Sequence, residues 1–273
     1  MSENTTVSIA VISGKGGVGK SNLALNICYC LHQIGRSVLL MDCDMGLANM
    51  DVLLGIAPQK HVQDILIENE DPASIILPVV NKDNRFDLIP ANSGMADFVD
   101  LDSGARSMLC SKINPLAAAY DFMCMDIGAG ISSTALGFSV MTTLRVVVVT
   151  PEPTSITDSY AMMKVIASRY NVTDFYILVN QVESSTEGKQ TYARLSAVCK
   201  RFLGFSPIFL GEVRSDRNVA EAVRKQKAFM TLSPRSPAAM DCLTVANSLN
   251  RLRDTLLAQG DLESPLRKLN VQE

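Results

Sequence analysis

The residues from Ser13 to Ser21 have the composition and spacing of a loop that binds phosphate groups. They read SGKGGVGKS, and the pattern G-x-x-x-x-G-K-S is complete from Gly14 to Ser21. Glycines allow tight turns and let backbone N–H groups approach anionic oxygens closely. Lys20 can neutralise the β- and γ-phosphates, and the hydroxyl of Ser21 can bind Mg²⁺. The stretch therefore predicts a site for a nucleoside triphosphate and Mg²⁺.

The same glycines also fit a second pattern, the dinucleotide fingerprint G-x-G-x-x-G, with Asp42 at a distance that suits a ribose contact. That fingerprint has no role for Lys20 followed by Ser21, whereas the phosphate loop uses both residues. We therefore favour the triphosphate. The loop residues predicted to contact it are Gly14, Lys15, Gly16, Gly17, Val18, Gly19, Lys20, Ser21 and Asn22.

The segments on either side of the loop are those that a phosphate site needs. Residues 7–12 form an apolar run that predicts a buried strand. After the loop, Leu23, Ile27, Leu31 and Ile34 recur at spacings of three and four, which predicts a helix. A helix that begins at the loop adds its partially positive N-terminus to the site.

Two further apolar runs end in carboxylates. Residues 37–41 lead into Asp42 and Asp44, and residues 121–126 close on Asp126. Ligands bind outside the carboxyl ends of strands in open α/β sheets, so these groups should reach the loop. Asp126 is the candidate that holds Mg²⁺. A carboxylate near Mg²⁺ and another near the attacking water would suit phosphate hydrolysis.

The rest of the chain continues the alternation of strands and helices. Further strands are expected at 86–90, 144–150, 175–180 and 207–213, and helices at 103–118, 217–230 and from 236 to about 257. Residues 58–85 read as polar and irregular, with helical turns near 62–66. We expect a doubly wound, mostly parallel sheet with helices on both faces, in one domain over 1–257 with a tail over 258–273.

Charge is distributed unevenly along the chain. Residues 1–187 hold 11 Lys and Arg against 20 Asp and Glu, while residues 188–273 hold 14 against 8. The predicted helix 217–230 should place Arg217, Arg224 and Lys225 on one side, with Val219, Ala222, Val223 and Phe229 toward the core. An anionic partner and an ordinary solvated face both remain open for this surface.

Targeting, membrane and metal signals are weak. No apolar stretch reaches the length of a membrane span, and the N-terminus lacks a signal peptide, so we expect a cytoplasmic protein. The seven cysteines include no C-x-x-C pair, which indicates buried thiols in a reducing compartment. His32 and His61 are far apart and suggest no metal site.

The loop, with its additional Lys15, resembles the GKGGVGK[ST] signature of the MinD/ParA family of dimerising ATPases. The resemblance implies a P-loop NTPase fold in which Lys15 reaches the partner's nucleotide across a dimer interface. It implies that Asp44 lies in switch I near Mg²⁺ and the catalytic water, with Asp42 supporting the loop. The segment 45–55 resembles the same switch, DxGLxNxDxLLG, in which Asn49 and Asp51 organise the segment. Residues 127–131 resemble switch II, although Gly128 departs slightly from the usual pattern.

A second segment separates subfamilies, because EPTSITDSYA at 152–161 closely resembles the FlhG/FleN flagellar-number ATPases. In MinD-like dimers the glutamate matching Glu152 lies near the partner's ribose, and the position of Asp158 serves dimerisation and partner binding. Asn180 ends a predicted strand, where an amide can pair with adenine, and the resemblance supports that role. Relatives read G-x-I-P-x-D near 211–216, and Arg214 replaces the proline. Adenine packing there is thus in question, and Arg214 is the candidate to stack instead.

The resemblance implies an ATP-dependent homodimer that limits flagellar number, acting with a transcription activator and a flagellar SRP-type GTPase. Turnover should be slow, because no base that is strong at neutral pH lies near the water. Two alternatives stay open: a cell-division or partitioning ATPase that acts through membrane or DNA, and an ATP-dependent metabolic ligase. Leu262, Leu266, Leu269 and Val271, with Arg267 and Lys268, would form a short membrane-touching helix in the first alternative, but Pro265 and nearby acidic residues weaken it.

Overall fold

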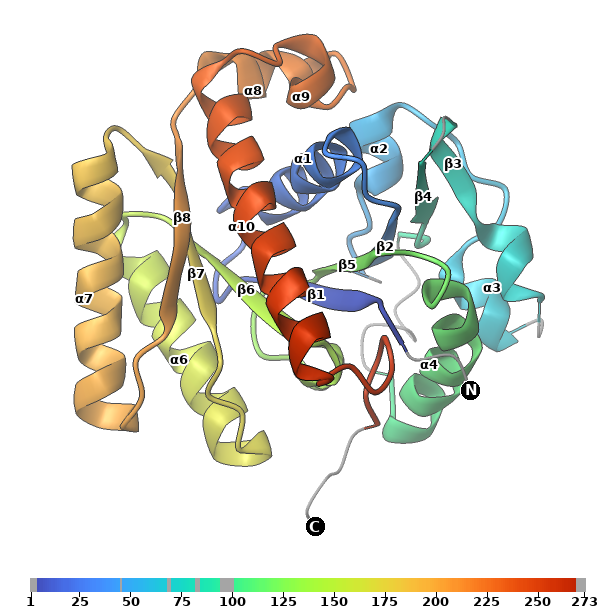
Figure 1. Cartoon of the computed structure of the whole chain (residues 1–273), viewed down its shortest axis with the longest axis horizontal. Helices are drawn as coiled ribbons and strands as arrows, with labels where there is room; N and C mark the ends of the chain where they lie inside the picture. Colours follow the sequence, from blue (N-terminus) through green and yellow to red (C-terminus); the bar gives the residue numbers. More distant parts are fainter. Residues whose placement is uncertain (1–3, 45, 68–69, 82–83, 94–100, 269–273) are drawn as a thin grey trace.

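The computed structural model describes residues 4–44, 46–67, 70–81, 84–93 and 101–268. An eight-stranded sheet in the order β3-β4-β2-β5-β1-β6-β7-β8 forms its centre (Figure 1). Every neighbouring pair is parallel except β3 and β4, which are antiparallel. The strands are β1 Val7–Ile12, β2 Val38–Cys43, β3 Leu77–Asn81, β4 Arg85–Ile89, β5 Phe122–Ile127, β6 Leu144–Val149, β7 Tyr176–Val182 and β8 Ile208–Arg214.

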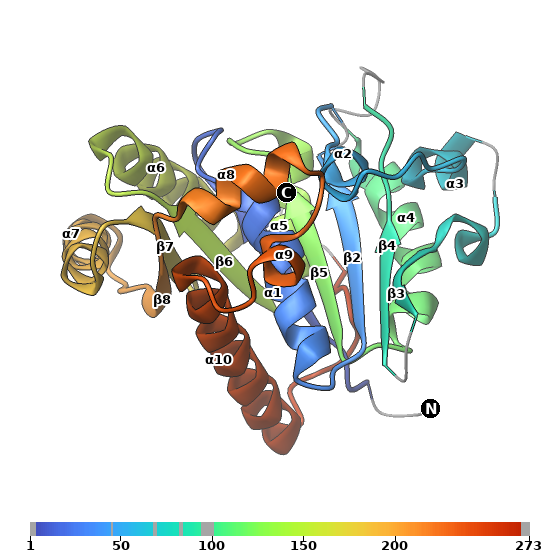
Figure 2. The ribbon, with the colours of Figure 1, turned by 90° about the horizontal axis from the view of Figure 1, so that it is seen from above.

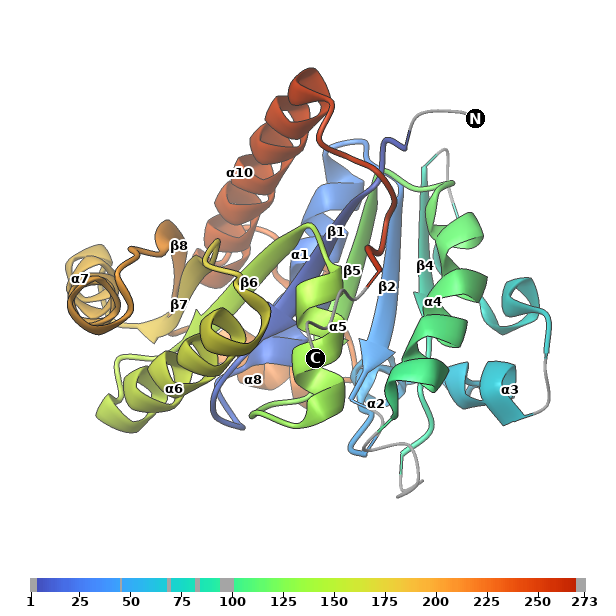
Figure 3. The ribbon, with the colours of Figure 1, turned by 90° about the horizontal axis from the view of Figure 1, so that it is seen from below.

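Helices cover both faces of the sheet, which confirms the expected fold class. Figures 2 and 3 show α1 and α8–α10 on one face and α4–α6 on the other. The helices are α1 Lys20–Gln33, α2 Met50–Leu54, α3 Val62–Ile67, α4 Ser103–Ala117, α5 Ser133–Met141, α6 Pro153–Tyr170, α7 Ser185–Leu203, α8 Arg217–Arg224, α9 Phe229–Leu232 and α10 Pro237–Gln259, with a short 3-10 turn η1 at Pro72–Ile75.

The central strands are buried on both sides, as parallel sheets require. Along β1, Val7, Ile9 and Val11 pack toward α1 and α10. Ala10 and Ile12 pack into the second core, under α4, α5 and α6. This alternation explains why the sequence shows a continuous apolar run instead of an alternating pattern.

Strand β1 lies at the point where the chain changes direction across the sheet. From β1 the chain moves to β2 on one side, and after β5 it continues through β6, β7 and β8 on the other side. The loop 13–19 leaves the carboxyl end of β1, between β5 and β6. Open α/β sheets form their ligand crevices at such switch points.

Two predictions made from the sequence are wrong in detail. The stretch 58–85 contains strand β3, which pairs antiparallel with β4 and carries a bulge between Pro78 and Val80. The predicted helix 217–230 ends at Arg224, because Gln226 has a left-handed backbone (φ 51°) and a separate short helix begins at Phe229. Val223, expected in the core, is exposed, whereas Ala222 and Phe229 are buried.

The tail after α10 packs against the domain instead of forming a helix. Residues 261–268 contain no helix, and the expected helix positions Leu269 and Val271 lie outside the described residues. Leu266 is buried in the core beneath α4 and α5. Its backbone forms two hydrogen bonds with the Asn114 side chain, and Arg267 N donates to Met141 O. Leu266, which would touch a membrane only under the division alternative, therefore belongs to the core.

Candidate functional site

The phosphate loop ends in backbone geometry that only glycine adopts without strain. Gly17 and Gly19 have φ angles of 80° and 86°. Gly19 is the N-cap of α1 and offers no side chain to the first turn, so the helix starts with backbone N–H groups free of a side-chain cap. At Gly16 and Gly17 an added Cβ would meet no atom within 4 Å. This side of the loop is therefore an open cradle for an anion.

Gly14 holds the loop against another element. A Cβ added there would lie 2.2 Å from the carbonyl carbon of Asp158, in helix α6. Backbone meets backbone at this point, so no residue with a side chain fits without moving α6 or the loop. The sequence-predicted residue Asp158 thus sits directly behind the phosphate loop, through its main chain.

A buried ion pair lies beneath the cradle. Lys20 Nζ is 2.6 Å from Asp126 Oδ1, and the side chains are 7% and 0% exposed. Burial raises the pKa of the Asp126 carboxyl, and the charge and hydrogen bond of Lys20 oppose that shift. Lys20 belongs to α1 and Asp126 to the end of β5. The ion pair therefore connects the phosphate loop with the acidic strand end, two motifs that were predicted separately from the sequence.

The second oxygen of Asp126 marks a place for a cation. Asp126 Oδ2 is buried and has no hydrogen-bond partner among the described residues. Ser21 also lies near this carboxylate, where its hydroxyl opposes the rise that burial causes in the pKa of Asp126. Mg²⁺ typically binds through one or two carboxylates together with phosphate oxygens and water. The donors present therefore fit Mg²⁺ that arrives with a nucleotide.

Asp42 is buried next to Asp126 and holds the following segment in place. Its Oδ1 accepts from Asp44 N at 3.0 Å, and its Oδ2 accepts from Asn49 N at 3.1 Å and Met50 N at 3.2 Å. Burial and the charge of Asp126 raise the pKa of Asp42 to about 7, although these three N–H groups oppose the shift. Asp42 therefore organises the loop before α2, whereas the resemblance implied that it supports the phosphate loop.

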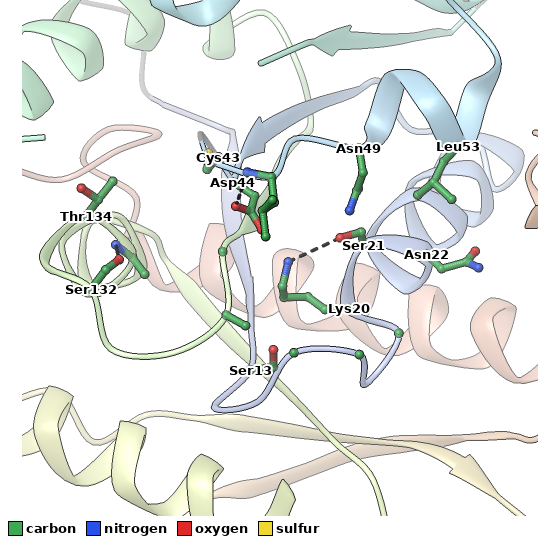
Figure 4. A pocket seen from close by; sticks show the side chains of 18 residues that line it. Ser13, Lys20, Ser21, Asn22, Cys43, Asp44, Asn49, Leu53, Ser132 and Thr134 are labelled. Atoms are coloured by element: carbon green, nitrogen blue, oxygen red, sulfur yellow. Dashed lines mark hydrogen bonds between the residues drawn. The ribbon is translucent and has the colours of Figure 1, made fainter. Parts of the chain in front are cut away.

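Asp44 lines a cavity of about 740 Å³ together with the loop and the start of α1. Figure 4 shows Lys20, Ser21 and Asp44 around one space, with Asn49 pointing toward it from the segment before α2. A Cβ at Gly128 would lie 3.2 Å from Asp44 Oδ1, so the glycine at this position leaves room for the carboxylate. The predicted residues that line this cavity are Gly16, Gly17, Gly19, Lys20, Ser21, Asn22 and Asp44.

Several lining residues were not among the predicted contacts. Asn49 Oδ1 is buried without a hydrogen-bond partner in the described part of the chain, and Asn49 lines the cavity. Ser132 caps α5 by accepting from Ala135 N, and it lines the opposite wall. The sequence offered a signal for both: Asn49 follows the acidic strand end, and a serine opens the helix after Asp126.

Lys15 and Glu152 lie outside this cavity, at the rim of the loop. Lys15 Nζ donates to Glu152 Oε2 at 2.6 Å and to Thr154 Oγ1 at 3.1 Å. The Lys15 and Glu152 side chains are 38% and 59% exposed, so the pair is open to solvent. The two residues that the sequence placed at a subunit interface thus contact each other within one chain.

A second, smaller cavity of about 240 Å³ adjoins the start of α1 and contains both predicted base contacts, Asn180 and Arg214. Asn180 Nδ2 donates one N–H to Val18 O at 2.8 Å, which leaves its amide oxygen and its second N–H for a ligand. Arg214 forms a two-point ion pair with Asp241, through Nε and Nη2, each at 2.8 Å. Gln181, which the sequence did not single out, lines the same cavity with a left-handed backbone (φ 59°).

The chain is similar to known proteins along most of its length. The family described as the CobQ/CobB/MinD/ParA nucleotide binding domain matches residues 9–229. The antiactivator FleN of Pseudomonas aeruginosa is 34% identical over 96% of this chain and 92% of its own length. The flagellum site-determining protein YlxH of Helicobacter pylori is 31% identical over 96% of this chain and 87% of its own length.

Solved structures share the fold at lower sequence identity. The cell-division ATPase MinD of Pyrococcus furiosus gives a TM-score of 0.75 at 21% identity, covering 90% of this chain and 99% of that one. MinD of Pyrococcus horikoshii, solved in complex with Mg-ADP, gives 0.75 at 19% identity, covering 90% and 97%. These likenesses support the doubly wound architecture.

Proposed function

Because this chain belongs to the CobQ/CobB/MinD/ParA nucleotide-binding family, we propose that it is an ATPase that works as a nucleotide-dependent switch. The observation that carries this proposal is the buried pair of Lys20 and Asp126 beneath an open loop. A lysine held there faces the bound phosphates, and the free oxygen of Asp126 serves Mg²⁺. Mg²⁺, when bound, supplies charge neutralisation to the β- and γ-phosphates.

The two cavities recognise different parts of the nucleotide, the phosphates in one and the base in the other. The open backbone of Gly16 and Gly17 cradles the phosphates. The free amide oxygen of Asn180 accepts from an amino group on the base. Adenine offers an amino group at the position where guanine carries a carbonyl, so this arrangement favours ATP over GTP.

Hydrolysis requires a water in line with the γ-phosphate. Asp44 is the carboxylate at the open side of the cavity, and we assign it the positioning of that water. A water-positioning carboxylate is a weak base at neutral pH, so turnover by the isolated protein is slow. Asp42 contributes by fixing the backbone of the segment that carries Asp44 and Asn49.

ATP then joins two subunits through the rim of the loop. Lys15 is exposed at this rim and pairs with Glu152 of its own chain. In an ATP-bound homodimer we assign Lys15 to the partner's phosphates and Glu152 to the partner's ribose. Replacing the Lys15–Glu152 pair within one chain by contacts with the partner costs little free energy, because solvent-exposed ion pairs contribute about 0–1 kcal/mol.

The biological role that we propose is control of flagellar number or placement. It rests on the similarity to FleN, described as an antiactivator, and to YlxH, described as a flagellum site-determining protein. A transcription activator and a flagellar SRP-type GTPase are the proposed partners. The burial of Leu266 in the core weighs against the alternative of a division ATPase that acts through a membrane helix at 262–271.

Sizing by light scattering with ATP, ADP and no nucleotide tests the switch. The parent protein should double its mass only with ATP. Lys15→Ala should bind ATP as a monomer with affinity near that of the parent. Lys189→Ala, which removes an exposed lysine in α7, is the matched control and should dimerise normally. An undiminished Lys15→Ala dimer would remove the crossing lysine from the mechanism.

The flagellar role needs a separate measurement. Flagella should be counted in a bacterium whose own copy of the gene is deleted and replaced by the parent or by Lys15→Ala. The parent should restore the normal number, and the variant should not. Normal flagella in the deletion strain, with misplaced division septa, would support the division alternative.

A further inference from the structure

The two edges of the sheet differ in how well they are protected. Edge strands expose unpaired backbone groups and invite pairing with other chains. At one edge, β3 carries an exposed proline, Pro78, which removes a backbone donor and blocks pairing. At the other edge, β8 has a register shift at Leu210, as β3 has at Pro78, but it contains no proline, and Ile208 is 49% exposed at its start. The β8 edge therefore keeps the capacity to accept another strand.

A groove runs beside this open edge. Figure 1 shows β8 between α7 and α10. On the α10 side, strand and helix enclose a groove of about 260 Å³. Its lining includes Ile208, Phe209 and Leu210 from β8, and Ser248, Arg251 and Leu252 from α10. Apolar walls next to an edge strand are what a strand-adding peptide needs, since alternate side chains enter the pocket.

Arg251 gives the groove a charge. Its Nη2 donates to Ser248 Oγ at 3.0 Å, and the side chain is exposed. In the described part of the chain no carboxylate lies within ion-pair distance of Arg251, whereas the neighbouring Arg253 pairs with Asp121 and Arg214 pairs with Asp241. An exposed guanidinium among apolar side chains is complementary to a carboxylate.

We propose that the β8 edge and its groove bind an extended, acidic segment of a partner protein by strand addition. The segment hydrogen-bonds to the β8 backbone, places apolar side chains against Ile208 and Leu252, and pairs a carboxylate with Arg251. A second copy of this chain is a poorer occupant. The one carboxylate within β8, that of Glu212, already accepts from Ser185 Oγ at 2.7 Å.

Selection from a displayed library of random twelve-residue peptides on the full-length protein tests this proposal. Selected peptides should alternate apolar residues and contain Asp or Glu. Synthesised singly, they should bind at least about tenfold more weakly to Arg251→Glu and to Ile208→Asp. Arg235→Glu, an exposed arginine before α10, is the matched control and should change binding less than about twofold.

Hydrogen exchange then distinguishes strand addition from other contacts, since bound peptide should protect amides of β8 but not of β3. Unchanged ATPase activity shows that each variant is folded. Failure of the library to enrich peptides, or equal binding to all four proteins, would overturn the proposal. So would a nucleotide-independent dimer that Ile208→Asp abolishes, because a second copy would then occupy the edge.

Discussion

The two halves of the nucleotide site are built in different ways. The phosphate half consists of open backbone at Gly16 and Gly17 and of the buried ion pair between Lys20 and Asp126, whose second carboxylate oxygen has no partner among the described residues. In the base half the side chains already hold other parts of the protein: Asn180 bonds to Val18, and Arg214 bonds to Asp241. The phosphate half therefore keeps open groups for a ligand, whereas the side chains of the base half are already hydrogen-bonded to the protein.

This difference indicates where binding energy and where selectivity arise. Charged phosphates that meet a buried lysine and free N–H groups form charge-assisted hydrogen bonds, which are about twice as strong as neutral ones. The base meets one amide oxygen and the side of an arginine that keeps its own partner. We therefore expect changes in the phosphate half to affect binding and chemistry strongly, and changes in the base half to affect selectivity modestly.

The largest effect should follow Lys20→Ala, which removes the buried lysine from the phosphate half of the site. The variant loses the charge facing the phosphates and leaves Asp126 buried without its partner. Affinity for ATP, measured by calorimetry, should fall at least about 100-fold, or about 2.7 kcal/mol. The melting temperature without nucleotide should fall as well, because a buried charge has lost its pair. Retention of parental affinity would show that the backbone cradle suffices.

Asp44→Ala should have the next largest effect, on chemistry rather than on binding. Hydrolysis should fall at least about tenfold, because the water is no longer positioned. ATP binding should persist, so the dimer should accumulate and stay. Phosphate release and light scattering on the same sample check both expectations. Asp261→Ala, which changes an exposed acidic residue after α10, is the control. If Asp44→Ala hydrolysed ATP as fast as the parent protein, Asp44 would have only a structural role at the end of its strand.

Asn180→Ala should change the choice of base while leaving the phosphates held. The preference for ATP over GTP should drop about fivefold, a size that matches one hydrogen bond of about 1 kcal/mol. Competition binding with both nucleotides measures it. Asn180→Asp keeps an acceptor for the adenine amino group but loses the donor to Val18. If Asn180→Asp retains the preference, the amide oxygen is the selective atom, and an unchanged ratio in Asn180→Ala would assign selectivity elsewhere.

Arg214→Ala should have the smallest effect. The arginine side chain is 45% exposed and already paired with Asp241. Exposed pairs contribute little to stability, so the unfolding free energy should change by at most about 1 kcal/mol. Affinity for ATP should change less than about threefold, or about 0.7 kcal/mol. A tenfold loss of ATP affinity would show that Arg214 stacks on the base and would erase the contrast between the two halves.

Most of the architecture could be predicted from the sequence because local patterns determine it. The apolar runs at β1, β5 and β6 are long enough to show buried strands, and the glycine loop identifies the end of β1. The strand β3 escaped detection because Pro78 interrupts a short apolar stretch in polar surroundings. The early end of α8 escaped because helical spacing continues past Gln226, whose left-handed backbone breaks the helix.

Pairings between distant residues could not be read from the sequence. The position of Asp126 at a strand end predicted that it would approach the loop, but not that it would bond to Lys20. The ion pairs Lys15 with Glu152 and Arg214 with Asp241 depend on how α6 and α10 pack on the sheet. Such packing is set by the whole core, so no local pattern records it.

The contact of Gly14 with the backbone of Asp158 has a consequence for genetics. A substitution at Gly14 collides with main-chain atoms, and no second-site change of a neighbouring side chain can make room. Gly188 is the opposite case, because a Cβ there would meet the side chain of Glu212 at 2.9 Å. Because the atom at 2.9 Å is the Cβ of Glu212, the expected suppressor of Gly188→Ala is Glu212→Gly. For Gly14→Ala a screen should return only reversion or changes that displace α6.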